Sequence, residues 1–106
     1  VEPDLEYRLS LTIGVDYDSD LDKVKRVMVE AAKGHSHVLQ EGPKMPYARV
    51  EEFGDSAIVM KMKLWIDNAD KRNRYAGEIR ELISRAFKRE GIVSPFPSRD
   101  VYIRKE

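Results

Sequence analysis

Two stretches of the chain alternate apolar and polar residues with the period of two that is typical of a half-buried β-strand. In residues 7–17 the apolar face carries Tyr7, Leu9, Leu11, Ile13, Val15 and Tyr17. In residues 57–67 one side carries Ile58, Met60, Met62, Leu64 and Ile66. Both stretches are therefore predicted to be strands with one buried face.

Two further stretches repeat apolar residues at the spacing of an amphipathic helix. The first carries Leu21, Val24, Val27, Met28 and Ala31, and the second carries Tyr75, Ile79, Leu82, Ile83 and Ala86. We expect the first helix to begin at a capping box formed by Ser19 and Asp22 and to end at Gly34. Asn68 or Asp70 could cap the second helix, and Gly91 is expected to end it.

Two shorter segments complete the predicted elements. "YARVEEF" at residues 47–53 and "DVYIR" at residues 100–104 are predicted strands, and Gly54-Asp55 indicates a hairpin turn. The order is then β-α-β-β-α-β. With right-handed crossovers, this order predicts an α+β, ferredoxin-like sandwich, in which one antiparallel sheet has both helices on one face. No linker or repeat divides the chain, so residues 1–106 are predicted to form a single domain.

The composition narrows the classes of function. The 19 basic and 19 acidic residues cancel, so no bulk positive charge favours nucleic acid or an anionic membrane. The absence of cysteine excludes disulfides, thiolate metal sites and cysteine nucleophiles. The longest apolar run, residues 57–60, is far shorter than the ~20 residues of a spanning helix, so we expect no membrane insertion by this segment. Because the chain begins with Val1 rather than methionine, we expect a fragment of a longer protein.

The chemical motifs favour neither a metal site nor an enzyme. The acids of residues 16–22 invite a calcium-loop interpretation, but Leu21 and Val27 stand where that loop needs glycine and glutamate. Charges at a helix start explain these acids better. His35 and His37 lack a nearby third ligand, so no metal is expected. No serine has a glycine-elbow context and no glycine-rich phosphate loop is present, so we predict no catalytic residues, no cofactor and no enzyme.

RNA binding is the more serious alternative, because ferredoxin-like RNA-binding domains stack bases on aromatic residues of the open sheet face. Here that face would carry Arg8, Ser10, Thr12, Lys61, Lys63, Trp65, Tyr102 and Arg104. The basic residues fit, but the paired central aromatics and the glycine–aromatic pattern of an RNA-recognition strand are missing. We therefore expect a solvated or oligomer-facing sheet and no nucleic-acid partner.

Three segments carry motifs of one known family. In "GIVSPFPSRDVYI", residues 91–103, two prolines hold the backbone around Phe96 extended. This segment resembles the G-I-x-x-P-F-P-x-x-x-V signature of the small-conductance mechanosensitive channel (MscS) family. The family's strand-to-helix junction, V-x-Y-x-(T/S)-D, is matched by Val15, Tyr17, Ser19 and Asp20. Its G-D-S hairpin is matched by Gly54, Asp55 and Ser56. The three segments occur in the family's order and cover nearly the whole chain.

The resemblance implies a role at a membrane pore that this chain does not itself contain. In MscS channels the matching domain belongs to a cytoplasmic cage of seven subunits below the plasma (inner) membrane. Ions and osmolytes pass through portals in the cage, and the channels respond to osmotic stress. By resemblance, the chain is expected to be this vestibule domain in a homo-oligomer, a heptamer, of the full-length protein. We expect Trp65, on the open sheet face, and Phe96, between its prolines, to contact neighbouring subunits.

The alternative is a free-standing ferredoxin-like module that binds a small ligand or RNA and acts in regulation. That alternative predicts a start codon close to Val1 in the native gene. It also predicts salt-dependent binding of single-stranded RNA if RNA is the ligand.

Overall fold

The computed structural model describes residues 6–95, and residues 1–5 and 96–106 lie outside the described part. The elements follow the order β1 (Tyr7–Val15), α1 (Leu21–Lys33), β2 (Tyr47–Phe53), β3 (Ile58–Ile66) and α2 (Arg72–Glu90). Short 3-10 turns at Gly42–Lys44 and Ala69–Lys71 precede β2 and α2. Every predicted element up to the second helix is therefore present. The strand predicted at residues 100–104 lies outside the described residues.

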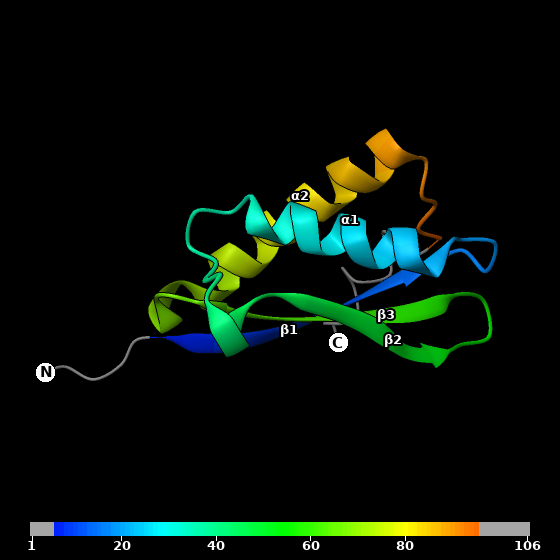
Figure 1. Ribbon diagram of the computed structural model, residues 1–106. Helices are drawn as coiled ribbons and strands as arrows, with labels where there is room; N and C mark the ends of the chain where they lie inside the picture. The colour runs from blue at the N-terminus through cyan, green and yellow to red at the C-terminus, as the bar shows by residue number, and fades with distance from the viewer. Residues whose placement is uncertain (1–5, 96–106) are drawn as a thin grey trace, which may run out of the picture.

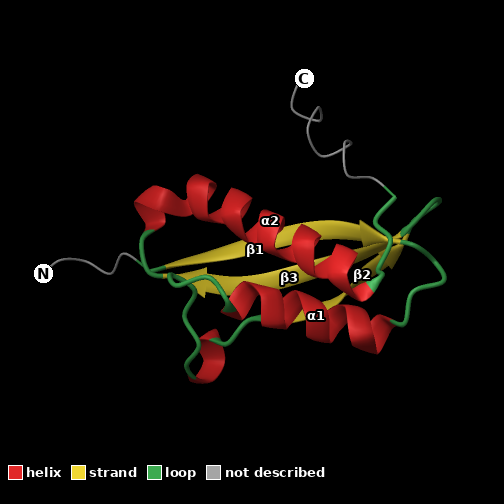
Figure 2. Cartoon of the chain, turned by 90° about the horizontal axis from the view of Figure 1, so that it is seen from above, coloured by secondary structure: helices red, strands yellow, loops and turns green. Residues whose placement is uncertain are grey.

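The strands form an antiparallel sheet in the order β1-β3-β2, and both helices lie on one face of it (Figure 1). Seen from above, α1 and α2 lie side by side across the sheet (Figure 2). This arrangement confirms the α+β fold with an antiparallel sheet and two helices on one face. In the described part of the chain, neither helix has the length and hydrophobicity needed to cross a bilayer.

The core lies between the helices and the inner face of the sheet. The register pairs apolar residues of β1 with apolar residues of the central strand β3, for example Leu9 with Leu64 and Leu11 with Met62. Along β3, buried and half-buried residues alternate from one end to the other. The helices contribute buried residues that include Val24, Met28, Ile79, Ile83 and Phe87. Each fully buried large side chain contributes about 1.5–3 kcal/mol relative to exposure, so this face supplies most of the stability.

The C-terminal ends of both helices agree with the sequence, whereas the caps at both N-terminal ends differ: α2 begins after Lys71 without a side-chain cap. Asp20, and not Ser19, caps α1, because an Asp20 carboxylate oxygen accepts the backbone N–H groups of Asp22 at 3.1 Å and Lys23 at 3.3 Å. Asn68 caps the 3-10 turn that leads into α2. Gly34 follows the last turn of α1. Gly91 ends α2 with a φ of 74°, a left-handed conformation that favours glycine.

Asp20→Ala is expected to lower the free energy of unfolding by about 0.5–2 kcal/mol, because it leaves two N–H groups at the start of α1 without their acceptor. Ser19→Ala is the matched control and should change the stability by less than about 0.5 kcal/mol. Urea unfolding followed by circular dichroism measures both variants. A larger loss of stability for Ser19→Ala than for Asp20→Ala would mean that Ser19 caps α1, as the sequence predicts.

Candidate functional site

The described parts of the three motif segments lie at one end of the domain, although they are far apart in the sequence. The β1–α1 junction, the β2–β3 hairpin and the segment after α2 all lie at the right-hand end in Figures 1 and 2. We call this region, residues 14–20, 53–57 and 90–95, the motif end. Side chains and backbone groups of these three ranges contact one another.

Tyr17 connects the junction to the hairpin. Its hydroxyl donates a hydrogen bond to the carbonyl oxygen of Gly54, and its ring stacks on Phe53 with centroids 6.4 Å apart. Both rings face solvent, with exposed fractions of 46% and 65%. A Cβ at Gly54 would lie 3.1 Å from the carbonyl oxygen of Ala57, so the hairpin backbone approaches itself closely where the motif has glycine. The strand predicted to reach Tyr17 ends at Val15 instead, which frees Tyr17 for this contact.

A second set of contacts attaches the segment after α2 to the end of β1. The Asp16 N–H donates to the Val93 carbonyl at 2.9 Å, and the Ser94 hydroxyl donates to the Gly14 carbonyl at 2.7 Å. The Lys23 ammonium donates to the Glu90 carbonyl at 3.0 Å, at the last turn of α2. Gly91 turns the chain back towards the sheet between these contacts. The motif end is therefore one connected structure built from all three segments.

A shallow hollow of about 220 Å³ opens within the motif end. Its lining includes the acids Asp16, Asp18, Asp20 and Glu90, with Lys23 as the lining cation. Among residues 6–95, no three His, Cys, Asp or Glu side chains gather as ligands for a metal ion. The hollow thus offers carboxylates to solvent or to another molecule.

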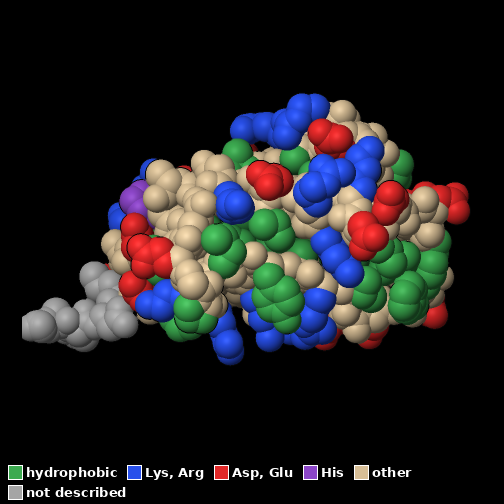
Figure 3. Space-filling model, in the orientation of Figure 1, with side chains coloured by type: hydrophobic (Ala, Val, Ile, Leu, Met, Phe, Trp, Pro, Cys, Tyr) green, Lys and Arg blue, Asp and Glu red, His purple; other side chains and the backbone are tan. Residues whose placement is uncertain are grey.

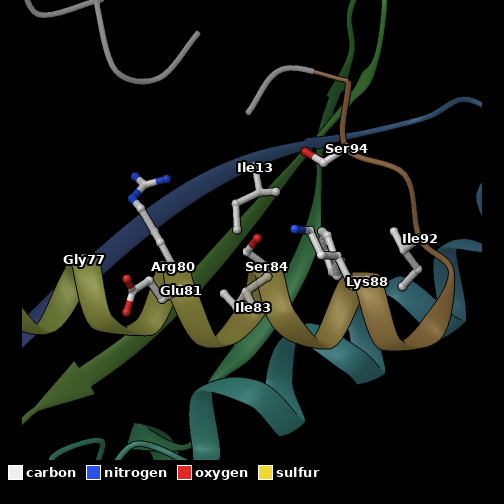
Figure 4. A pocket seen from close by; sticks show the side chains of 10 residues that line it. Ile13, Gly77, Arg80, Glu81, Ile83, Ser84, Lys88, Ile92 and Ser94 are labelled. Atoms are coloured by element: carbon white, nitrogen blue, oxygen red, sulfur yellow. The ribbon is translucent and has the colours of Figure 1, made fainter. Parts of the chain in front are cut away.

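A larger groove of about 400 Å³ runs between α2 and β1 (Figure 4). Its apolar floor is formed by Ile13, Ile83, Phe87 and Ile92. Two polar side chains bind carbonyl groups of β1: an Arg80 guanidinium nitrogen donates to Thr12 at 3.2 Å, and Ser94 donates to Gly14. Within the described residues β1 pairs only with β3, so these bonds cover carbonyls on an otherwise open sheet edge.

The face of the sheet away from the helices carries a mixed row of cations and aromatic rings. We call this surface the open sheet face; its residues are Arg8, Ser10, Thr12, Tyr47, Arg49, Lys61, Lys63 and Trp65. The six residues predicted there from β1 and β3 are confirmed, whereas Tyr102 and Arg104 lie outside the described residues. Trp65 is half-buried, and the Lys44 ammonium lies 5.5 Å from its ring centroid. Phe96, the other predicted contact residue, also lies outside the described residues.

The sequence did not predict a cluster around the two histidines, which consists of His35, His37, Asp67, Tyr75 and Glu78. The buried His35 accepts the His37 N–H at Nδ1, so its Nε2 is the donor to the Glu78 carboxylate at 2.7 Å. His37 stacks on Tyr75 with centroids 4.5 Å apart, and its Nδ1 lies 3.1 Å from both Asp67 carboxylate oxygens. These contacts join the end of α1 to β3 and α2, which is a structural role. The only signal in the sequence was the pair of histidines just after a helix.

The neighbours of Glu78 in this cluster shift the pKa of its carboxyl. The pKa of its carboxyl lies below the ordinary value of 4.5, first because His35 donates a hydrogen bond to it and second because Arg74 donates another. A carboxyl whose pKa is lowered by folding stabilises the fold at pH values above its unfolded pKa. That stabilisation is lost as the pH falls through the folded pKa.

Glu78→Gln is accordingly expected to lower the melting temperature at neutral pH, and the difference from wild type should vanish at pH values below the folded-state pKa of Glu78. Thermal unfolding followed by circular dichroism across that pH range measures the effect. Glu81→Gln is the control, because Glu81 lies on the same helix and forms an exposed ion pair with Arg85 at 3.8 Å. A difference that stays constant at every pH would mean that Glu78 acts through packing and not through its charge.

Tyr17→Phe is expected to lower the free energy of unfolding by about 0.5–1.5 kcal/mol, because the Gly54 carbonyl loses its donor while the ring stacking is kept. Tyr47→Phe is the matched control, an exposed tyrosine on β2 with an exposed fraction of 50%. Denaturant unfolding measures the stability, and amide exchange of the β2–β3 hairpin shows where it is lost. Equal effects of the two variants would argue against the bond between junction and hairpin.

Comparisons with known proteins agree with the motifs. Residues 9–94 match the profile of the family described as mechanosensitive ion channel MscS, C-terminal. The chain is 33% identical over 98 residues to an uncharacterized MscS family protein of Synechocystis, covering 92% of this chain and 32% of that protein. It is 30% identical over 96 residues to the small-conductance mechanosensitive channel of Edwardsiella ictaluri, covering 91% of this chain and 32% of the channel.

The fold also matches a solved channel structure. The crystal structure of Helicobacter pylori MscS in its closed state superposes with a TM-score of 0.78 at 22% identity, covering 87% of this chain and 36% of that chain. At this identity the match concerns the fold alone. The chain spans about a third of the length of the relatives it matches. The alternative of a free-standing RNA- or ligand-binding module is not favoured by these matches.

Proposed function

Because the chain belongs to the MscS family of mechanosensitive ion channels, we propose that it is the cytoplasmic vestibule domain of such a channel. In this role it contributes to a cage below the membrane pore and to the portal wall through which ions and osmolytes pass. It also contributes to the assembly of identical subunits, seven by the resemblance of its motifs to the family.

The observation that carries this proposal is the convergence of two family motifs and the first five residues of the third, residues 91–95, at the motif end. At this end Tyr17 and Phe53 are exposed and stacked on each other, and Tyr17 directly precedes Asp18 of the hollow lined by carboxylates. Exposed aromatic rings with polar neighbours are typical of surfaces that contact other proteins. A densely charged surface, with 36% charged residues in the chain, also suits a water-filled compartment that ions cross.

The test of this function uses the full-length gene that contains this chain. Expressed in a bacterium that lacks its own mechanosensitive channels, it is expected to restore survival of a sudden drop in osmolarity. Membrane patches should show a conductance that opens with tension. A truncated gene that stops before this domain serves as the comparison. Full-length protein that reaches the membrane but gives neither survival nor tension-gated current would overturn the proposal.

The predicted role of Trp65 at a subunit contact has its own test, since the chain contains no cysteine. In a full-length protein without other cysteines, Trp65→Cys should react slowly with a maleimide in the assembled protein and several-fold faster after dissociation in denaturing detergent. Glu81→Cys is the control, because the Glu81 side chain is 70% exposed on α2 and should react fast in both states. Fast reaction of both thiols in the assembled protein would mean that position 65 does not lie at a subunit contact.

A further inference from the structure

The open sheet face carries positive charge that is not neutralised within the described residues. Lys61 and Lys63 have no ion-pair partner among residues 6–95, whereas Arg49 pairs with Glu51 at 3.0 Å. The register places Arg49 directly opposite Lys61 and Tyr47 opposite Lys63. Like charges directly opposite on neighbouring strands are destabilising. A carboxylate brought to this face from outside would relieve that repulsion.

The motif end has the opposite charge. Asp18 in the motif end and Asp22, which lies beside it on the first turn of α1, are exposed and have no ion-pair partner among the described residues. Asp18 directly follows Tyr17 in the chain, and the exposed Tyr17 ring stacks on Phe53. In Figure 3, acidic side chains lie beside hydrophobic ones at the right-hand end, and basic side chains line the lower edge, on the side of the sheet away from the helices. The two surfaces therefore differ in charge and share an aromatic centre.

We propose that the open sheet face of one copy of this chain binds the motif end of a neighbouring copy. In this contact Lys61 and Lys63 pair with Asp18 and Asp22 of the neighbour, while the aromatic rings of the two surfaces form the centre. Such an arrangement, with aromatic residues at the centre and charged residues at the rim, is the usual anatomy of a protein interface. The inference rests on the proposed function and specifies which surfaces the subunits use.

The occupant is a second copy because one chain carries both complementary surfaces. The formal net charge of the chain is zero, so two copies do not repel each other as wholes while their opposite surfaces attract. The two surfaces are different parts of the molecule, so the contact is heterologous, with the face of one subunit against the end of the next. Heterologous contacts between identical subunits build closed rings when the rotation closes. A ring is the form that a cage around a pore requires.

Carbodiimide cross-linking of the full-length protein in membranes tests this contact, because the reagent joins a lysine to a carboxylate only when the two touch. Peptides that link Lys61 or Lys63 to Asp18 or Asp22 of another copy are expected by mass spectrometry. The double reversals K61E/K63E and D18K/D22K should each lower the cross-linked oligomer by about tenfold, since each places like charges in contact. The four reversals combined should restore it.

The control is E81K/R85E, which reverses an exposed ion pair on α2 and should assemble like wild type. Thermal unfolding of each variant of the 106-residue chain shows whether its fold is kept. The proposed contact is wrong if both double-reversal variants assemble like wild type, or if the variant with all four reversals does not recover assembly. Such a result does not contradict the proposed channel function, because that function is tested separately by survival of osmotic shock with the unaltered gene.

Discussion

Burial of one face of a three-stranded sheet against two helices is the constraint from which the other surfaces follow. In the central strand β3 every second side chain enters the core, and its neighbours must point the other way because the side-chain period of a strand is two. A slip by one residue would bury Lys61, Lys63 and Trp65 and expose Met60, Met62 and Leu64. The cations of the open sheet face are therefore placed by the same packing that makes the core.

The same constraint determines where the three motifs meet. Because β1 and β3 are antiparallel neighbours, the end of β1 lies beside the start of β3, and the hairpin and the β1–α1 junction come together. α2 crosses the sheet on the helical face, and Gly91 turns its end back to β1. The junction contributes an aromatic ring and acids, the hairpin a close backbone turn, and the last segment a serine hydroxyl and a carbonyl. Each residue type performs a task that this meeting point requires.

Positive and negative side chains lie on two different surfaces of the domain. The 19 basic and 19 acidic residues cancel over the whole chain, yet Lys61 and Lys63, without ion-pair partners among residues 6–95, lie on the open sheet face, and exposed acids such as Asp18 lie at the motif end. A domain with opposite charges on two different surfaces can join identical neighbours head to tail.

The sequence by itself determined the order of the elements, the alternation of β3 and the class of fold, because strand and helix periods are local properties of the chain. It misplaced the cap of α1, since Ser19 and Asp20 are both good cap residues and only the backbone at the helix start selects between them. Tertiary structure alone decided that Tyr17 binds Gly54, that His35 binds Glu78 and that Ser94 binds Gly14. These partners lie 37, 43 and 80 residues apart, and such contacts exist only after the helices have packed on the sheet.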